Sequence, residues 1–213
     1  MNSRTFSALR GLYLLTPDEK DTPRLLARVA EVIGEGPVLL QYRNKAADAA
    51  LRRRQARALL PLCQAHGVGL MVNDDWQLAA DIGAAGAHLG ESDGELAQAR
   101  LALGPNALLG ASCYNQLELA IRARDAGADH VAFGAFFDSG TKPGARRASP
   151  DLLTQARTLG LATVAIGGIS PDNARILLAA GADLLAVLGA VFGAANPAAA
   201  TRALVASFEP DTQ

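Results

Sequence analysis

Acidic side chains follow two consecutive apolar runs of the sequence. The run "GLMVN" from Gly69 leads directly into Asp74 and Asp75, and the run "GAHLG" from Gly86 is followed by Asp93. If the two runs are neighbouring strands about 4.8 Å apart, carboxylates at their ends can reach one cation. Carboxylates without a cluster of His or Cys form a hard oxygen site, which suits Mg²⁺ better than zinc. Asp74 and Asp93 are therefore candidate magnesium ligands.

Helix capping is the alternative explanation for these carboxylates. Asp75 precedes "WQLAADIG" and is the natural N-cap of a helix there, which leaves Asp74 less well explained by capping. Asp93 stands before "GELAQARLALG" and could cap that helix instead of binding a metal. His88 lies inside an apolar run, and we interpret it as a core residue bonded to a backbone carbonyl.

Cations and a hydroxyl follow other apolar runs. The run "VLLQY" continues into "QYRNK", where strand alternation sends Gln41 and Arg43 to one side, and Lys45 follows if the backbone stays extended. Burying the polar Gln41 side chain in an apolar strand costs free energy unless it is hydrogen-bonded, so a partner or a function is expected for it. Ser112 ends the run "LLGAS", and Lys142 lies in the polar segment "GAFFDSGTKPGA". A solvated loop that begins a charged helix is the alternative for the cations.

Glycines at the ends of the last two apolar runs indicate a phosphate site. Gly168 lies in "AIGGIS" and Gly189 in "AVLGAVFG". Glycine lets backbone N–H groups approach an anion, and a helix N-terminus adds donors, although a glycine can also simply permit a turn. Ser139, Gly140 and Thr141 offer two hydroxyls and a bare backbone nearby. Together these groups suggest one pocket for two phosphorylated substrates, one of which arrives with a metal.

Eight short apolar runs must position these residues, and helical patterns separate them. The runs are mostly too continuous for half-exposed strands, so they indicate a parallel sheet buried on both faces. Two of the helical segments begin with a cap and a proline, Thr22 before Pro23 and Ser170 before Pro171. The eight runs cover residues 11–16, 38–42, 69–73, 86–90, 108–112, 130–134, 163–168 and 184–189.

This alternation predicts an α/β protein, a (β/α)₈ TIM barrel that forms a single domain over residues 1–213. An open doubly wound sheet is the main alternative, but it more often has five or six strands and a switch point. In a barrel the chemistry lies on the loops after the strands, which is where the candidate residues fall.

Composition narrows the classes of partner and compartment. The net charge is −1, so no global field favours nucleic acid or an anionic membrane. The two cysteines, Cys63 and Cys113, match no metal-ligand spacing, and Cys113 lacks an evident base. We find neither a signal peptide nor an apolar span of bilayer length, and expect a cytoplasmic protein that acts on small molecules. Nothing in the sequence indicates an oligomeric state.

The motifs, in this order, resemble the thiamine phosphate synthase (thiamine-phosphate pyrophosphorylase) family from about Gly11 to Pro197. The matching elements are "QYRNK", "NDD", "HLGESD", "GAS", "GAFFDSGTK", "AIGGI" and "GADLLAVLGAVF". The resemblance implies a transferase of thiamine biosynthesis. Such an enzyme joins 4-amino-2-methyl-5-hydroxymethylpyrimidine diphosphate to a thiazole phosphate and releases pyrophosphate.

The resemblance also implies a role for each site residue. One Mg²⁺ per active site would be bound by Asp74 and Asp93, and the catalytic cations would be Arg43, Lys45 and Lys142. The pyrimidine diphosphate would be bound by Gln41, Tyr42, Arg43, Asn44, Lys45, Asn73, Ser112 and Lys142. The thiazole phosphate would be bound by Ser139, Gly140, Thr141, Gly168, Leu188 and Gly189. The chain departs from the usual family residues at Tyr42 (usually Leu), Glu91 (Gln), Ala135 (Pro), Ser139 (Thr) and Gly189 (Ser).

The mechanism that the resemblance implies is a dissociative alkyl transfer. Negative charge builds on the departing diphosphate, where Mg²⁺ and the cations stabilise it. The aminopyrimidine stabilises its own methylene cation, so no protein nucleophile is needed. The alternatives are a thiazole tautomerase-like isomerase, which generally lacks the full diphosphate and metal set, another phosphate-binding barrel lyase or isomerase, and a non-catalytic binding protein.

Overall fold

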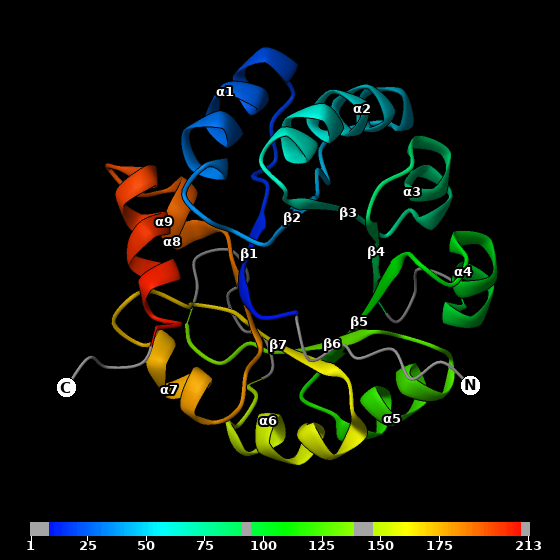
Figure 1. The fold of residues 1–213 in the computed structure, drawn as a ribbon, viewed down its shortest axis with the longest axis vertical. Coiled ribbons are helices and arrows are strands. Elements are labelled where there is room, and N and C mark those ends of the chain that lie inside the picture. The colour runs from blue at the N-terminus through cyan, green and yellow to red at the C-terminus, as the bar shows by residue number, and fades with distance from the viewer. Residues whose placement is uncertain (1–8, 91–94, 139–146, 210–213) are drawn as a thin grey trace.

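Eight parallel strands close into a barrel in the order β1 to β8, and β8 pairs back with β1. The structure is a computed structural model that describes residues 9–90, 95–138 and 147–209. Helices form a ring outside the strands (Figure 1). The predicted (β/α)₈ barrel is confirmed, and the alternative of an open doubly wound sheet is wrong.

The strands coincide with the eight predicted apolar runs. Side chains alternate between the barrel interior, where Tyr13, Leu39 and Met71 pack together, and the outer layer beneath the helices, where Leu12 and Leu40 lie. Apolar residues on both faces explain why the runs show no polar alternation. The strands are β1 Gly11–Leu15, β2 Leu39–Tyr42, β3 Gly69–Asn73, β4 Gly86–Leu89, β5 Leu108–Tyr114, β6 His130–Phe133, β7 Ala162–Ile166 and β8 Leu184–Val187.

The helices follow the strands in alternation, with the four-residue helix α8 inserted between β8 and α9. Within the described ranges no helix is both long and apolar enough to cross a membrane. The helices are α1 Thr22–Ile33, α2 Ala49–Ala65, α3 Trp76–Ile82, α4 Leu96–Leu103, α5 Leu117–Asp125, α6 Asp151–Ala156, α7 Ala174–Ala179, α8 Gly189–Phe192 and α9 Pro197–Ala206, and the 3₁₀-helix η1 Arg157–Leu159 follows α6.

The predicted cap of α1 was one residue too late. Asp21, not Thr22, is the N-cap, and its carboxylate accepts a hydrogen bond from the Arg24 N–H at 2.9 Å. A carboxylate there satisfies an unpaired N–H and interacts favourably with the helix dipole, which favours Asp over the neighbouring Thr. The predicted end at Gly34 is confirmed, since Gly34 is the C-cap.

The predicted cap of α7 was also wrong, and the difference affects the site. Ser170 lies in a turn before the helix, which begins at Ala174 with Asn173 as N-cap. The Asn173 side chain instead accepts from the Ser170 N–H at 2.9 Å and donates to the Gly168 carbonyl at 3.0 Å. Asn173 therefore holds the loop after β7, where the phosphate site was predicted.

Two carboxylates, one buried and one partly buried, fix the amino-terminal ends of the strands. The Asp129 carboxylate pairs with the Arg100 guanidinium and accepts from the Leu109 N–H at 2.7 Å. Asp183 accepts from the Thr163 N–H at 2.8 Å in the same way. These two residues belong to the repeated "GAD" segments of the sequence. The repetition therefore reflects the same hydrogen bond, from a strand N–H to the Asp before the next strand, used twice. The opposite, carboxyl ends of the strands are where barrels of this kind carry their active sites.

Candidate active site

Gln41 points into the barrel. Its side chain is buried, and its Nε2 donates to the Tyr13 hydroxyl at 2.7 Å. Burial raises the pKa of Tyr13, so this hydroxyl stays protonated at neutral pH. The polar residue inside an apolar strand thus has a partner on β1, and its role toward a substrate stays a prediction.

The loop that carries Arg43 and Lys45 is held by two residues that follow β1. The Arg43 N–H donates to the Thr16 hydroxyl at 2.9 Å, and that hydroxyl donates to the Arg43 carbonyl at 2.9 Å. Asp18 accepts from the Lys45 N–H at 2.8 Å and lies 3.4 Å from the Arg43 guanidinium. We did not predict Thr16 or Asp18. The available signal was their position at a strand end, in the segment "LLTPD".

Tyr42 and Asn44 alternate to the other side of this segment. The Tyr42 hydroxyl donates to Gln55 Oε1 at 2.8 Å, and Asn44 Nδ2 donates to the same oxygen at 2.9 Å. Asn44 also donates to the Glu19 carbonyl at 2.6 Å. These bonds attach the segment to α2 and leave the two side chains facing away from the barrel interior. Their assignment to the pyrimidine diphosphate stays a prediction.

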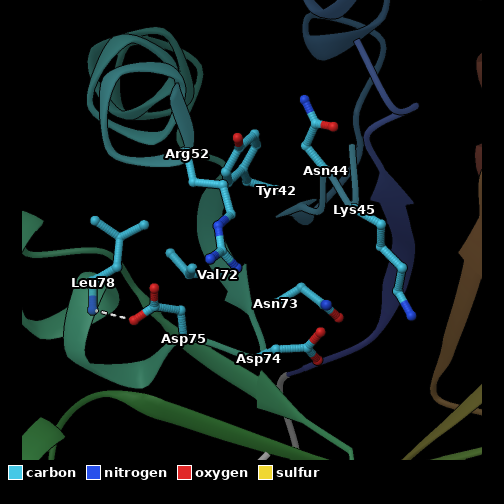
Figure 2. A pocket seen from close by; sticks show the side chains of 9 residues that line it. All are labelled: Tyr42, Asn44, Lys45, Arg52, Val72, Asn73, Asp74, Asp75 and Leu78. Carbon is cyan, nitrogen blue, oxygen red and sulfur yellow. Dashed lines mark hydrogen bonds between the residues drawn. The ribbon is translucent and has the colours of Figure 1, made fainter. Parts of the chain in front are cut away.

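The two neighbouring aspartates after β3 have different surroundings. The Asp75 carboxylate accepts from the Leu78 N–H at 2.8 Å, which confirms it as the N-cap of α3. Asp74 has a positive φ of 64°, and its N–H donates to the His88 carbonyl at 2.9 Å. Figure 2 shows the two carboxylates pointing in different directions. Asp tolerates this left-handed conformation better than most residues, at a cost of about 1 kcal/mol.

A small pocket with a cavity volume of about 40 Å³ lies between the ends of β2 and β3 (Figure 2). Arg52 reaches into it from α2, and its Nε is buried without a hydrogen-bond partner in the described part of the chain. We did not predict Arg52, because in the sequence "LRRRQAR" it resembles its solvent-facing neighbours. The lining residues are Tyr42, Asn44, Lys45, Arg52, Val72, Asn73, Asp74, Asp75 and Leu78.

The magnesium prediction requires oxygen donors at the ends of two neighbouring strands, β3 and β4. β3 and β4 are neighbours, with Asn73 opposite His88, as a site shared by their two ends requires. Asp74 and Asn73 give the pocket oxygen donors without thiolate or imidazole, a set that fits Mg²⁺. Asp93 lies outside the described residues, and within those residues no three His, Cys, Asp or Glu side chains gather to hold a metal. Magnesium binding stays a prediction.

Ser112 is the last member of a row of polar side chains in the barrel. Its Oγ lies 3.0 Å from His88 Nε2, and His88 Nδ1 lies 3.3 Å from Nε2 of His130. The predicted burial of His88 is confirmed. The prediction named a backbone carbonyl as its partner, whereas its two ring nitrogens contact side chains of β5 and β6. We did not predict His130. Cys113 is buried and its pKa is raised to about 12 by burial, so it stays a thiol.

The predicted phosphate loops follow the adjacent strands β7 and β8. Gly168 has a positive φ of 66°, and a Cβ there would lie 2.4 Å from the Asp138 carbonyl oxygen, so only glycine fits. Leu188 is the N-cap of α8, and a Cβ on Gly189 would meet nothing within 4 Å. The other predicted residues of this side, Ser139, Gly140 and Thr141, lie outside the described residues, as does Lys142.

The fold and this rim define a barrel enzyme whose candidate groups for phosphate and metal lie at the carboxyl ends of the strands. The family described as thiamine monophosphate synthase matches residues 12–191. The chain therefore belongs to the thiamine monophosphate synthase family, and it is an enzyme of the transferase class.

Individual relatives agree with this assignment. The chain is 53% identical over 204 residues to a thiamine-phosphate synthase of Xanthomonas campestris, covering 96% of this chain and 98% of the relative. It is 50% identical to one of Thioalkalivibrio sulfidiphilus, with 97% and 99% covered. Among solved structures it is similar to thiamine phosphate pyrophosphorylase from Pyrococcus furiosus, with a TM-score of 0.81, 32% identity, and 92% and 94% covered. A 3-hexulose-6-phosphate synthase, 20% identical with a TM-score of 0.70, shares the fold.

The buried His130 predicts how stability depends on pH. Burial, with a smaller contribution from His88, lowers the pKa of His130 from 6.5 to about 3. Below pH 6.5 the unfolded chain binds a proton that the folded chain does not. We therefore expect the free energy of unfolding to fall by roughly 1 kcal/mol per pH unit from this residue as the pH drops from 6.5 toward 5. Urea unfolding at several pH values measures it.

The variant His130→Leu should lose this part of the slope. His66→Gln is the matched control, because His66 is exposed. A wild-type and a His130→Leu protein with the same dependence of stability on pH between 6.5 and 5 would contradict the assignment.

Proposed function

We propose that the protein is a thiamine phosphate synthase that couples 4-amino-2-methyl-5-hydroxymethylpyrimidine diphosphate to a thiazole phosphate with Mg²⁺ bound, releasing pyrophosphate. The observation that carries the proposal is the position of Lys45, Asn73 and Asp74 around one pocket at the ends of β2 and β3. Family membership over most of the chain supports the reaction class. A cytoplasmic location stays a prediction.

The diphosphate end of the first substrate would lie against the β2 and β3 loops. Arg43 and Lys45 bring positive charge to this rim, and Thr16 and Asp18 hold their backbone in place before a substrate binds. A cation whose backbone is already in place has less to reorganise when it stabilises a leaving group. Asp18 beside Arg43 also limits where that guanidinium can move.

Magnesium would be held by Asp74 on one side, and by Asp93 from the neighbouring β4 end. When bound, the ion would neutralise charge that develops on the departing diphosphate. The protein's own contribution is to orient Asp74, whose backbone is fixed by its bond to the His88 carbonyl. Ser112 and Gln41 would position the pyrimidine from inside the barrel, which lets the thiazole nitrogen attack the methylene from the opposite side.

The thiazole phosphate would bind at the ends of β7 and β8. Gly189 has open space beside its Cα, so its backbone N–H could approach an anion there, and Asn173 fixes the loop after β7 by donating to the Gly168 carbonyl. The second substrate thus approaches from the side of the barrel across from β3 (Figure 1). The separation of the two phosphate regions matches a reaction between two phosphorylated molecules.

A product assay with both substrates tests the proposal and its metal. Thiamine phosphate and pyrophosphate should form in equal amounts with Mg²⁺, and neither should form once the metal is chelated. Asp74→Asn should lower kcat/KM on the order of 100-fold, because it removes the carboxylate ligand. The fold should survive, since Asn also tolerates a positive φ. Isomerisation of the thiazole without coupling, or an unaltered rate in Asp74→Asn, would contradict the proposal.

Asp75→Asn is the matched control, one residue away. Asn is as good an N-cap as Asp, so the bond to the Leu78 N–H is retained and the rate should stay close to that of the wild type. Equal losses in Asp74→Asn and Asp75→Asn would indicate a general effect of charge, and would count against a metal ligand at Asp74.

Gly189 offers a second prediction about the thiazole phosphate. Gly189→Ser should fold normally, because a Cβ there meets nothing within 4 Å, and it adds a hydroxyl at the predicted phosphate loop. We expect KM for the thiazole phosphate to fall severalfold with kcat nearly unchanged, as one hydrogen bond to a charged group is gained. Steady-state kinetics with the pyrimidine diphosphate saturating measures it.

Gly168→Ser is the control for this change on the neighbouring strand end. Its Cβ would lie 2.4 Å from the Asp138 carbonyl oxygen at a positive φ, so it should be destabilised and bind worse. An unchanged or raised KM in a well-folded Gly189→Ser would place the phosphate elsewhere.

A further inference from the structure

Three polar side chains run in single file across the barrel interior toward the candidate site. His130 on β6 is fully buried, His88 on β4 is buried, and Ser112 on β5 stands at the carboxyl end of the row. The His130 Nε2 to His88 Nδ1 distance is 3.3 Å, and the His88 Nε2 to Ser112 Oγ distance is 3.0 Å. Each contact can be a hydrogen bond, but its direction depends on which ring nitrogens carry protons.

The row has space in the barrel because position 110 is a glycine. A Cβ on Gly110 would lie 2.1 Å from His130 Nε2 and 2.4 Å from His88 Nδ1, so any other residue between Leu109 and Ala111 would separate the rings. The two imidazoles stack with centroids 5.5 Å apart and 28° between their planes. Tyr13 packs against His130 in a T-shaped arrangement, with centroids 6.0 Å apart and 83° between the ring planes. The orientation of the His130 ring is therefore constrained by its packing against two other rings.

The surroundings of His130 determine the direction of the bonds. Its Nδ1 is buried and has no hydrogen-bond partner within the described residues. The ring is neutral, because burial lowers its pKa to about 3, so one nitrogen carries a proton and the other a lone pair. A buried N–H without an acceptor is rarer in proteins than an unpaired acceptor, which places the proton on Nε2 and the lone pair on Nδ1.

We propose that His130 and His88 are positioning residues that orient the Ser112 hydroxyl toward the substrate. His130 Nε2–H donates to His88 Nδ1, so the His88 proton lies on Nε2 and is donated to Ser112 Oγ. Ser112 accepts there, and its own O–H is left to donate to an acceptor atom of the pyrimidine diphosphate. If both tautomers were reversed, the Ser112 O–H would donate its hydrogen bond to His88, and only the lone pairs of Ser112 would face the site.

This inference rests on the proposed function only in its last step, the identity of the acceptor. The direction of the row is a property of the protein without substrate. Because the Ser112 O–H already points toward the site, it can bind a negatively charged or lone-pair-bearing substrate atom without first reorienting. The row also lets His130 affect the reaction through two hydrogen bonds, although His130 is fully buried at the end of the row farthest from the rim.

Long-range ¹H–¹⁵N spectra of the full chain labelled in histidine measure the tautomers directly. The chain has three histidines, so His66→Gln, His88→Gln and His130→Gln each assign one ring. At neutral pH and without substrates we expect both His130 and His88 to be protonated at Nε2 only. A proton on Nδ1 of either ring would overturn the proposal. If the wild-type protein formed no thiamine phosphate, the proposed function would be wrong, but the measured tautomers would still decide the direction of the row.

Kinetics then test whether the row acts through Ser112. His130→Leu removes the donor and should lower kcat/KM roughly tenfold, while His130→Gln, whose amide N–H reaches about the same position, should keep most of the activity. In a Ser112→Ala background the His130→Leu change should have little further effect. His66→Gln serves as the unaffected control.

Two results would overturn this step. One is a loss in His130→Gln as large as that in His130→Leu, and the other is an undiminished effect of His130→Leu in the Ser112→Ala background. A destabilised His130→Leu would be recognised by its thermal unfolding, and the tautomers of the wild type decide the direction of the row without that variant.

Discussion

The hydrogen bond from the Asp74 N–H to the His88 carbonyl is the interaction on which the site depends. It continues the pairing of β3 with β4 one residue beyond Asn73 and holds Asp74 in a left-handed conformation that an extended strand would not give. The same pairing places His88, whose ring contacts His130 and Ser112 inside the barrel. One backbone contact therefore positions the predicted metal ligand and the interior row that ends at Ser112.

Stability and chemistry occupy opposite ends of the barrel. At the amino-terminal ends of the strands, Asp129 and Asp183 accept N–H groups of neighbouring strands, and Arg100 completes its pair with Asp129. Such bonds hold the strands in register and need no substrate. At the carboxyl ends, Asp74 is held at a positive φ, which costs an Asp residue conformational energy, whereas Gly168 adopts its positive φ without strain. Strain of this kind is tolerated where the surrounding structure fixes the backbone and is typical of functional sites.

The fold and part of the site could be predicted from the sequence because they depend on local patterns. Eight continuous apolar runs indicated the barrel, the polar Gln41 inside an apolar strand indicated a residue with a specific partner or role, and the position of Asp75 before a helix indicated its cap. The sequence did not indicate Arg52, which has charged neighbours on α2, or the partnership of His88 with His130, which are 42 residues apart. Contacts between strands depend on register in space, which a one-dimensional pattern does not contain. Ser139, Thr141, Lys142 and Asp93 lie outside the described residues, so their roles remain predictions.

The central claim is that the β3–β4 pairing presents Asp74, together with Asp93, to one divalent ion. The most direct measurement is a crystal structure with Mn²⁺ and pyrophosphate, in which the anomalous signal of the metal locates it without reference to activity. The account predicts one strong peak at coordinating distance from carboxylate oxygens of both Asp74 and Asp93, with pyrophosphate bound on the side of Arg43 and Lys45. A metal bound elsewhere, with the Asp74 carboxylate directed away from it, would contradict the account.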